Sequence, residues 1–315
     1  MKKFFILFIL VFSIIISGCS GLSLLSETED DREETEKTEE TEEIEETEAT
    51  ELTEVTETQK ETKPQQTTES AAETPSVPTT SDLLIVEALY EDSYTDPDDG
   101  VVIFEGFVQS ITVELPGHEE VVSRMNEVLD LLRDESIASV GVTREDAISM
   151  YDEFGSEGMV GPNVWETTIA PAIISDRIVC FYVGHYMYYG GAHGGYYAET
   201  YTFDVQTGEV LSLEAICEDK DGFEAFIFEQ IISQIEAVPE EESMYFPEYE
   251  TSVGEAFSRA IWEFAEIEGE MTFYVTYQQY DLAPYAAGMP GFAIPLSDCV
   301  TYFNTYGQSL VEDIV

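Results

Sequence analysis

Residues 177–205 read RIVCFYVGHYMYYGGAHGGYYAETYTFDV, two apolar and aromatic runs separated by a glycine-rich bend. Val, Tyr, Phe and Thr favour strands, and neither run contains a proline that would interrupt strand pairing. We therefore predict strands at 177–189 and 196–205, joined by a loop that contains four glycines. Gln206-Thr207-Gly208 then supplies a tight turn.

The spacing of apolar residues on both sides of this strand pair predicts the remaining helices and strands. Apolar or alternating runs indicate further strands at 83–90, 101–115 (one bent strand or a hairpin), 163–174, 271–277 and 292–295. Apolar residues at helical spacing indicate helices at 118–133, 143–154, 222–238, 254–266 and 296–303. Strands joined by short turns, with helices between them, predict an α+β fold with a mainly antiparallel sheet and several packed helices.

Two loops combine glycines with tyrosines, and we expect both at one edge of the sheet because both leave strands. The first is YYGGAHGG at 188–195, and the second is YDLAPYAAGMPG at 280–291. Glycine lets a backbone approach a partner closely, and tyrosine supplies contact area at low entropic cost. A wide hairpin whose tyrosines only cover the sheet is the alternative. The candidate partner-binding residues are Tyr188, Tyr189, Gly190, Gly191, His193, Tyr280, Pro284 and Tyr285.

Catalytic motifs are absent from the sequence. There is no GxSxG, no HExxH and no glycine-rich phosphate loop of the GxxxxGK or GxGxxG type. A site built from His185, His193 and a carboxylate such as Asp204 is a weaker alternative, because no metal-ligand spacing supports it. We therefore expect no catalytic residue, no metal and no cofactor, and we expect the chain not to be an enzyme.

The charge of the chain limits the partners that it can bind. The formal net charge is −54, and residues 81–315 alone carry 46 acidic and 6 basic residues, a net of −40. Nucleic acid is excluded as a partner, because binding phosphates requires lysine and arginine. Such a field attracts cationic partners, although the same acidity could serve solubility alone.

The N-terminus has the pattern of a lipoprotein signal peptide, which we place at 1–18. Lys2 and Lys3 precede an apolar run that ends in Ile16-Ser17-Gly18-Cys19. Small residues before a cysteine resemble the bacterial lipobox, so Cys19 is the expected lipidation site. We then expect a chain anchored by lipid to the outer face of the bacterial cytoplasmic membrane, at the cell surface.

Residues 19–80 are predicted to be a disordered, Glu- and Thr-rich acidic linker, because they contain few apolar residues. Three cysteines follow the linker: Cys180, Cys217 and Cys299. Their number allows at most one disulfide, and we interpret them as small buried apolar residues.

The two loops and their surroundings resemble a bacterial extracellular family, the RsiV-type domain of anti-sigma-factor sensors and some peptidoglycan deacetylases. The matching motifs are YGGAHG at 189–194, FD at 203–204, TG at 207–208, LSL at 211–213, FYV at 273–275, APYAAG at 283–288 and IP at 294–295. Residues 161–315 form the RsiV-like α+β domain in this comparison. Residues 81–160 are similar, more weakly, to the companion subdomain, in which a helix carries Met125-Asn126.

The resemblance implies a non-catalytic binding or sensing module. Members of the family recognise lysozyme, a cationic enzyme, through loops, so lysozyme and peptidoglycan are the expected ligands. Only Met1 to Lys3 precede the apolar run, and no deacetylase domain follows. We therefore expect neither signalling to a sigma factor nor deacetylation. The alternatives are a wall-modifying enzyme that uses His193 and a structural envelope protein.

Overall fold

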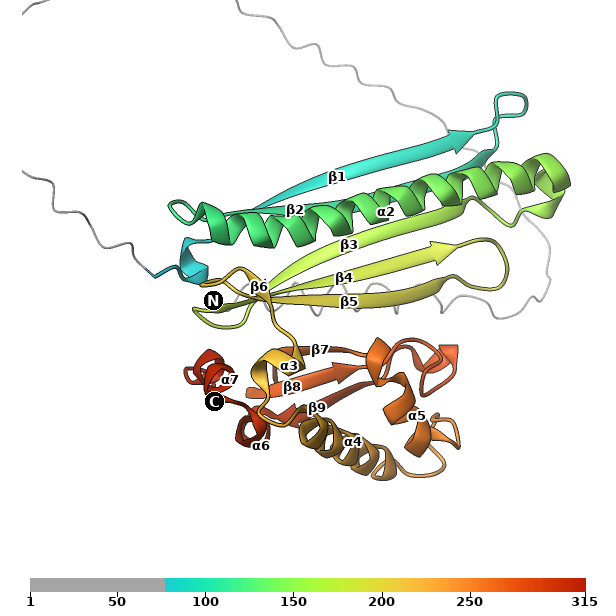
Figure 1. Ribbon diagram of the computed structural model, residues 1–315. Helices are drawn as coiled ribbons and strands as arrows, with labels where there is room; N and C mark the ends of the chain where they lie inside the picture. The colour runs from blue at the N-terminus through green and yellow to red at the C-terminus, as the bar shows by residue number, and fades with distance from the viewer. Residues whose placement is uncertain (1–76) are drawn as a thin grey trace, which may run out of the picture. The chain divides into compact units, whose positions relative to one another are not determined.

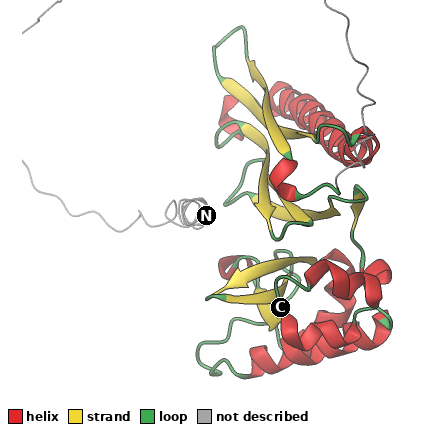
Figure 2. Ribbon diagram, turned by 90° about the vertical axis from the view of Figure 1, so that its left-hand side faces the viewer, coloured by secondary structure: helices red, strands yellow, loops and turns green. Residues whose placement is uncertain are grey.

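The computed structural model describes residues 77–315, which belong to one compact unit, Ser70–Val315 (Figures 1 and 2). The predicted signal peptide, Cys19 and nearly all of the predicted linker lie outside the described residues. The boundary predicted between residues 160 and 161 falls between a helix and a strand and stays a prediction. Within 77–315, no helix has the length and hydropathy needed to cross a membrane.

The larger sheet has six strands in the order β1-β2-β3-β4-β5-β6. All neighbours are antiparallel except β2 and β3, which run parallel. The strands predicted around the glycine-rich bend are present and paired, so the expected α+β class with mainly antiparallel pairing is confirmed. The bounds are β1 Leu84–Thr95, β2 Val102–Glu114, β3 Asn163–Ile173, β4 Ile178–Tyr188, β5 Gly195–Asp204 and β6 Glu209–Val210.

One long helix, α2 (Glu119–Phe154, 36 residues), packs against the larger sheet and runs along strands β2 and β3 (Figure 1). The prediction of two helices there, at 118–133 and 143–154, was wrong. Thr143 is not a cap but a buried residue inside the helix, because the apolar stripe continues through Ser136 and Val140. The buried residues of the stripe are Met125, Leu129, Leu132, Ser136, Val140, Thr143, Ala147 and Tyr151.

The helix also completes the hydrogen bonding of β2. This strand pairs with β3 only over residues 104–108. Beyond that stretch, the Asn126 side chain accepts from the Val113 amide and donates to the Val113 carbonyl, both at 2.9 Å. A buried backbone would otherwise lose these bonds.

The smaller sheet has three strands in the order β7-β8-β9. Its strands are β7 (Ile261–Ile267), β8 (Glu270–Thr276) and β9 (Gly291–Pro295), packed on α4 (Lys220–Glu236). The helix predicted at 254–266 was wrong: α5 (Tyr249–Ala256) ends early and β7 follows. Glu268 and Gly269, with φ of 53° and 88°, form the two-residue hairpin turn that pairs β7 with β8.

Short helices complete the C-terminal part. They are α3 (Leu213–Ile216), α6 (Leu296–Cys299) and α7 (Thr305–Val311). The helix predicted at 296–303 is α6 followed by a 3-10 turn at Val300–Tyr302, and α7 was not predicted. Phe223 packs edge-to-face against Phe273 and Phe303, which fixes α4 and the C-terminal turns over the smaller sheet. Of the described residues, Cys180, Cys217 and Cys299 are buried, as interpreted from the sequence, and each is a free thiol.

Candidate functional site

The two glycine- and tyrosine-bearing loops meet. His193 and Tyr285 stack face to face, with ring centroids 3.8 Å apart and planes inclined by 18°. Tyr280 lies against Tyr285 with a centroid distance of 6.2 Å, and Pro284 beside it is exposed. We name His193, Tyr280, Pro284 and Tyr285 the aromatic surface. It combines residues from a loop of the larger sheet with residues that follow β8 of the smaller one.

The glycines of the first loop are required by its backbone. Gly190 and Gly191 have φ of 85° and 100°, a region that residues with a Cβ rarely adopt. A Cβ on Gly194 would lie 2.4 Å from the Tyr186 ring. The Tyr188 hydroxyl donates to the Gly191 carbonyl at 3.0 Å, which closes the loop on itself. The loop therefore has one defined shape that presents His193.

The first part of the second loop is held by contacts on either side of Tyr280. The buried Tyr277 hydroxyl donates to the Val253 carbonyl at 2.8 Å, and the Phe246 amide donates to the Leu282 carbonyl at 2.8 Å. Asp281 accepts from Arg259 at 2.6 Å. Between these contacts Tyr280 has a φ of 69° and is 53% exposed. Such a backbone is costly for a tyrosine and persists only where the surroundings hold it.

Two glutamines, which the sequence analysis did not single out, join the loops. The Gln278 side chain accepts from the Ala198 amide at 3.0 Å and donates to the Ala198 carbonyl at 2.8 Å. Gln279 accepts from the Tyr196 amide at 2.9 Å. These bonds complete the edge of β5, since β6 pairs only with Phe203 and Asp204. The only signal in the sequence was a polar pair directly after an apolar strand.

The remaining candidate residues are placed differently. The Tyr189 hydroxyl lies 3.4 Å from the Thr143 hydroxyl of α2, so Tyr189 contacts the long helix, while its ring remains 43% exposed. Tyr188, Gly190 and Gly191 shape the loop instead of extending the aromatic surface. The structure thus brings His193, Tyr280, Pro284 and Tyr285 together. Tyr189 instead contacts Thr143 of α2 and takes no part in the ring contacts of the aromatic surface.

His185, His193 and Asp204, the residues of the alternative histidine site, each make polar contacts with other groups and not with one another. His185 is buried, with Nδ1 3.1 Å from the Thr167 hydroxyl and Nε2 3.3 Å from Glu199. His193 Nδ1 lies 2.9 Å from the carbonyl oxygen of Gly194. Across residues 77–315, no group of three or more His, Cys, Asp or Glu side chains is arranged to hold a metal ion.

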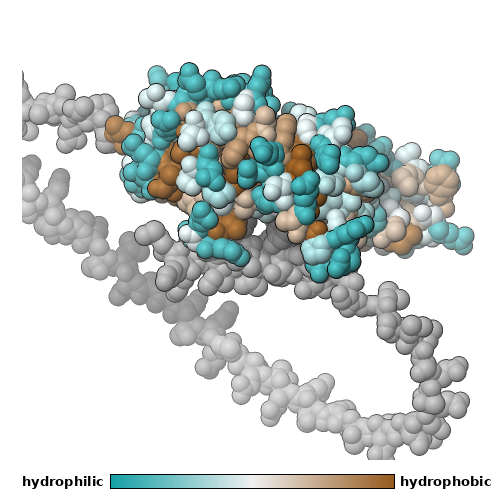
Figure 3. Space-filling model, turned by 90° about the horizontal axis from the view of Figure 1, so that it is seen from below, coloured by the Kyte–Doolittle hydropathy of each residue, from teal (hydrophilic) through white to brown (hydrophobic). Residues whose placement is uncertain are grey.

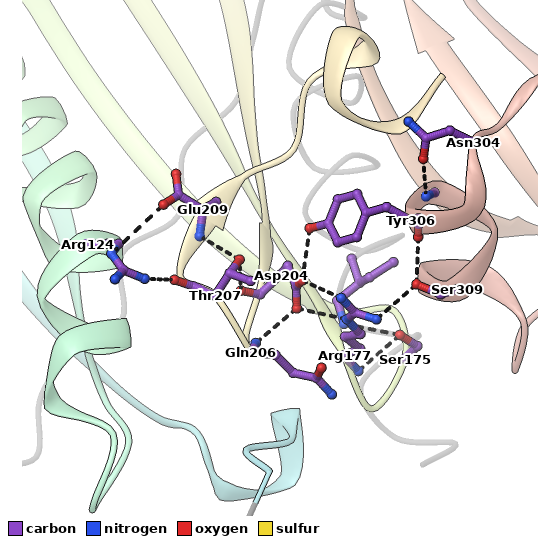
Figure 4. Close-up of polar contacts among 12 residues, drawn as sticks. Arg124, Ser175, Arg177, Asp204, Gln206, Thr207, Glu209, Asn304, Tyr306 and Ser309 are labelled. Carbon is purple, nitrogen blue, oxygen red and sulfur yellow. Dashed lines mark hydrogen bonds and ion pairs between the residues drawn. The ribbon is translucent and has the colours of Figure 1, made fainter. Parts of the chain in front are cut away.

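Asp204, the carboxylate of that alternative, is a structural centre (Figure 4). Its buried carboxylate accepts two bonds from Arg177, at 3.0 and 2.8 Å, and one from the Tyr306 hydroxyl at 2.9 Å. Arg177 also donates to Ser309 at 3.1 Å. Because Tyr306 and Ser309 belong to α7, these bonds attach the C-terminal helix to the larger sheet.

All six basic residues of 81–315 are already engaged in ion pairs. Each lies within 4 Å of a carboxylate: Arg124, Arg133, Arg144, Arg177, Lys220 and Arg259. The net −40 of this part of the chain is therefore carried mainly by carboxylates that no cation of the described residues neutralises. On the face seen in Figure 3, hydrophilic residues surround small groups of apolar ones.

A titratable carboxyl lies between the two sheets. The Cys180 thiol of β4 is 3.8 Å from the Glu263 carboxylate of β7. Burial raises the pKa of Glu263 to about 7. Burial likewise raises the pKa of the neighbouring tyrosines Tyr182, Tyr196 and Tyr274. The contact between the sheets thus favours neutral groups.

Comparisons with known proteins give a fold. No protein-family model and no curated protein sequence matches the chain. A solved structure of a DUF3298 family member from Bacteroides fragilis is similar, with a TM-score of 0.58 and 16% identity over 74% of this chain and 98% of that one. A DUF3298 family protein from Pseudomonas aeruginosa aligns with a TM-score of 0.42 and 14% identity, over 71% of this chain and 96% of that one. The first likeness supports the α+β architecture, and DUF3298 is a domain of unknown function.

Proposed function

We propose that this chain is a bacterial surface lipoprotein whose folded part is a non-catalytic module that binds a cationic extracellular ligand. The observation that carries the proposal is the aromatic surface, because a stacked His193 and Tyr285 belong to two separately braced loops. A surface that is already ordered loses little entropy on binding. Exposed tyrosines of this kind are typical of recognition surfaces.

Charge defines the class of ligand. A binding partner approaches a domain with a net charge of −40 and with its cations already paired. Electrostatic steering then accelerates association with cationic proteins and opposes anionic ones. Lysozyme is the first candidate because it is cationic and because the loops resemble those of RsiV-type domains. Cell-wall peptidoglycan is the second.

The proposed place of action is the outer face of the cytoplasmic membrane. The basic residues, the apolar run and Cys19 at the N-terminus support lipid attachment. The acidic linker would then hold the binding domain away from the membrane surface, because like charges extend a chain.

The direct test is the binding of lysozyme to the full chain at 0.15 M salt, compared with an unrelated cationic protein of similar size. We expect saturable retention of lysozyme, weakened at least about tenfold by Tyr280→Ala, since truncating a central aromatic contact costs about 2 kcal/mol or more. Tyr90→Ala is the matched control, because Tyr90 is 37% exposed at the opposite edge of the larger sheet. If the unrelated cationic protein bound equally well, the binding of lysozyme would be explained by non-specific charge attraction and the proposal would fail.

A second measurement separates binding from catalysis. The full chain is incubated with cell-wall fragments, and the release of soluble muropeptides is followed over time. We expect no turnover by the wild-type chain or by His193→Ala. Turnover that His193→Ala abolishes would establish the enzyme alternative and refute a non-catalytic module.

A further inference from the structure

Strand β1 is an open edge of the larger sheet. It pairs with β2 alone, over 12 residues, and no other strand of residues 77–315 lies on its outer side (Figure 1). Six consecutive residues, 86–91, are exposed. A run of this length is exposed on both faces of the strand, because successive side chains point to opposite faces. Both the side chains and the outer backbone edge of β1 are therefore accessible.

The edge lacks the features that usually prevent strand addition. Natural edges carry lysine, proline or a bulge, which discourage pairing with another chain. Residues 84–95 contain no Lys, Arg or Pro, and the only shift in register with β2 falls at Tyr94/Thr95. The exposed stretch includes Leu89, which is 62% exposed, and Val86, which is 49% exposed. The strand is thus open to a pairing segment.

The side chains of β1 specify what that segment must carry. Val86, Ala88 and Tyr90 share one face of the strand, whereas Glu87, Leu89 and Glu91 share the other. Glu87 and Glu91 form no ion pair with any cation of residues 77–315, whereas Arg144 lies 3.1 Å from Asp92. An added strand with apolar residues on one face and cations on the other matches both faces.

Charge also decides which polypeptide segment could pair with β1: one from a second copy of this chain, one from residues 26–73, or one from a partner protein. A second copy of the folded part brings a net charge of −40, and residues 26–73 of this chain bring 20 acidic against 4 basic residues. Both would place further carboxylates beside Glu87 and Glu91, and like charges across a strand pair are destabilising. We propose that β1 binds an extended segment of a partner protein, in which Lys or Arg alternates with apolar residues, as an additional strand of the sheet.

This edge is distinct from the aromatic surface. Strands β2, β3 and β4 lie between β1 and β5, the strand that carries the first loop. Main-chain hydrogen bonds would supply affinity, and the alternating side chains would supply specificity. The proposal therefore stands even if the aromatic surface has another ligand.

The probe is an octapeptide that alternates Lys and Val, titrated against the full chain. The first control is a peptide of the same composition in the order Lys-Lys-Val-Val, which keeps the charge and removes the alternation. The second is the alternating peptide with N-methyl groups along one edge, which removes main-chain donors. We expect the alternating peptide to bind at least about tenfold more tightly than either control.

Two variants locate the binding. Leu89→Lys puts a cation on the edge and should weaken the alternating peptide at least about tenfold. Leu131→Lys is the matched control, because Leu131 of α2 is also exposed, at 59% against 62% for Leu89, and should leave binding within about twofold. Lysozyme binding should be unchanged by Leu89→Lys. The failure of strand addition at β1 can therefore be distinguished from the failure of ligand binding at the aromatic surface.

Three results would overturn the proposal. One is equal binding of the alternating and reordered peptides. Another is concentration-dependent self-association of the full chain that Leu89→Lys removes and Leu131→Lys retains, which would identify a second copy as the occupant. The third is peptide binding that appears only after deletion of residues 26–73, which would identify the chain's own acidic segment as the occupant.

Discussion

The imidazole of His193 lies flat against the ring of Tyr285, with 3.8 Å between the ring centroids. The two residues come from loops attached to different sheets, so the stack exists only while the sheets are in contact. Gln278 and Gln279 set this contact through their bonds to β5. A ligand that binds the aromatic surface, as we propose, would therefore depend on the contact between the sheets.

The first prediction concerns the stack itself. Tyr285→Ala and Pro284→Ala should each weaken lysozyme binding at least about tenfold, while the melting temperature falls by less than about 3 °C. The stability effect is small because Pro284 is exposed and Tyr285 is only half-buried. Surface plasmon resonance and calorimetry on the same preparations measure the two quantities.

A double-mutant cycle provides the control for that prediction. Stacked aromatic rings contribute about 0.5–1.5 kcal/mol beyond their buried area. His193→Ala and Tyr285→Ala should therefore be non-additive in the free energy of unfolding by an amount in this range. Strict additivity would mean that the rings do not interact in solution. A loss of stability above about 1.5 kcal/mol in Tyr285→Ala would mark the residue as structural.

The second prediction concerns Gln278. Its side chain bonds the amide and the carbonyl of Ala198 and also the Arg259 carbonyl, at 2.9 Å. Gln278→Ala should lower the free energy of unfolding by about 1–3 kcal/mol, because it leaves backbone groups of β5 unpaired. It should also weaken ligand binding, because the two loops would no longer be held in contact. Urea unfolding and lysozyme titration measure the two effects.

Gln206→Ala is the matched control, since Gln206 donates to Asp204 through its backbone amide and not through its side chain. Its stability should change by less than about 0.5 kcal/mol. Gln278→Ala with wild-type stability and wild-type binding would show that the glutamine bonds do not hold the loops together.

The parts of the fold that sequence predicts are those with local signals. The strands on either side of the glycine-rich bend follow from the β-branched and aromatic residues and from Gly190 and Gly191, which the bend requires. The single helix α2 was divided wrongly because the charged residues at 133–135 and the helix-disfavouring Gly141 interrupt the apolar spacing, although Ser136 and Val140 continue the buried stripe. Strand β7 was taken as a helix because its apolar residues do not alternate cleanly.

The candidate site was predictable only in its components. The sequence shows that His193 and Tyr285 lie in glycine-bearing loops, and that both loops leave strands. It does not show that the loops meet, because the meeting depends on long-range bonds from Gln278 and Gln279 to β5. Side-chain bonds to a distant backbone have no period along the chain. The parallel pairing of β2 with β3 is a long-range contact of the same kind.

The third prediction concerns pH. Burial raises the pKa of Glu263 from its ordinary value of 4.5 to about 7, so the folded state favours the protonated carboxyl. The free energy of unfolding is therefore highest, as far as this group is concerned, below about pH 4.5. It falls as the pH rises from about 4.5 to about 7, and above pH 7 the buried charge lowers it by on the order of 3 kcal/mol relative to low pH.

Glu263→Gln removes the titration and keeps the shape of the side chain. It should be more stable than the wild type at pH 8 and similar to it at pH 4, as measured by urea unfolding. Glu266→Gln on the same strand is the control, because Glu266 is exposed. Other carboxylates repel one another equally in all three proteins, so the difference reports Glu263. A difference between Glu263→Gln and wild type that does not vary with pH would contradict the raised pKa.

The fourth prediction concerns the attachment of α7 through Asp204. Arg177→Gln would leave the buried carboxylate without its two guanidinium bonds, and Tyr306→Phe would remove the bond from the tyrosine hydroxyl. The first should cost about 3–5 kcal/mol and the second about 1–3 kcal/mol. Arg124→Gln is the matched control, because both its ion pair with Glu209, at 3.9 Å, and its bond to the Thr207 carbonyl are exposed, and together they should contribute no more than about 1 kcal/mol. Hydrogen exchange should show the largest loss of protection in α7 for Arg177→Gln. If Arg177→Gln and Arg124→Gln lowered the free energy of unfolding equally, Asp204 would not be the centre that holds the C-terminal helix to the larger sheet.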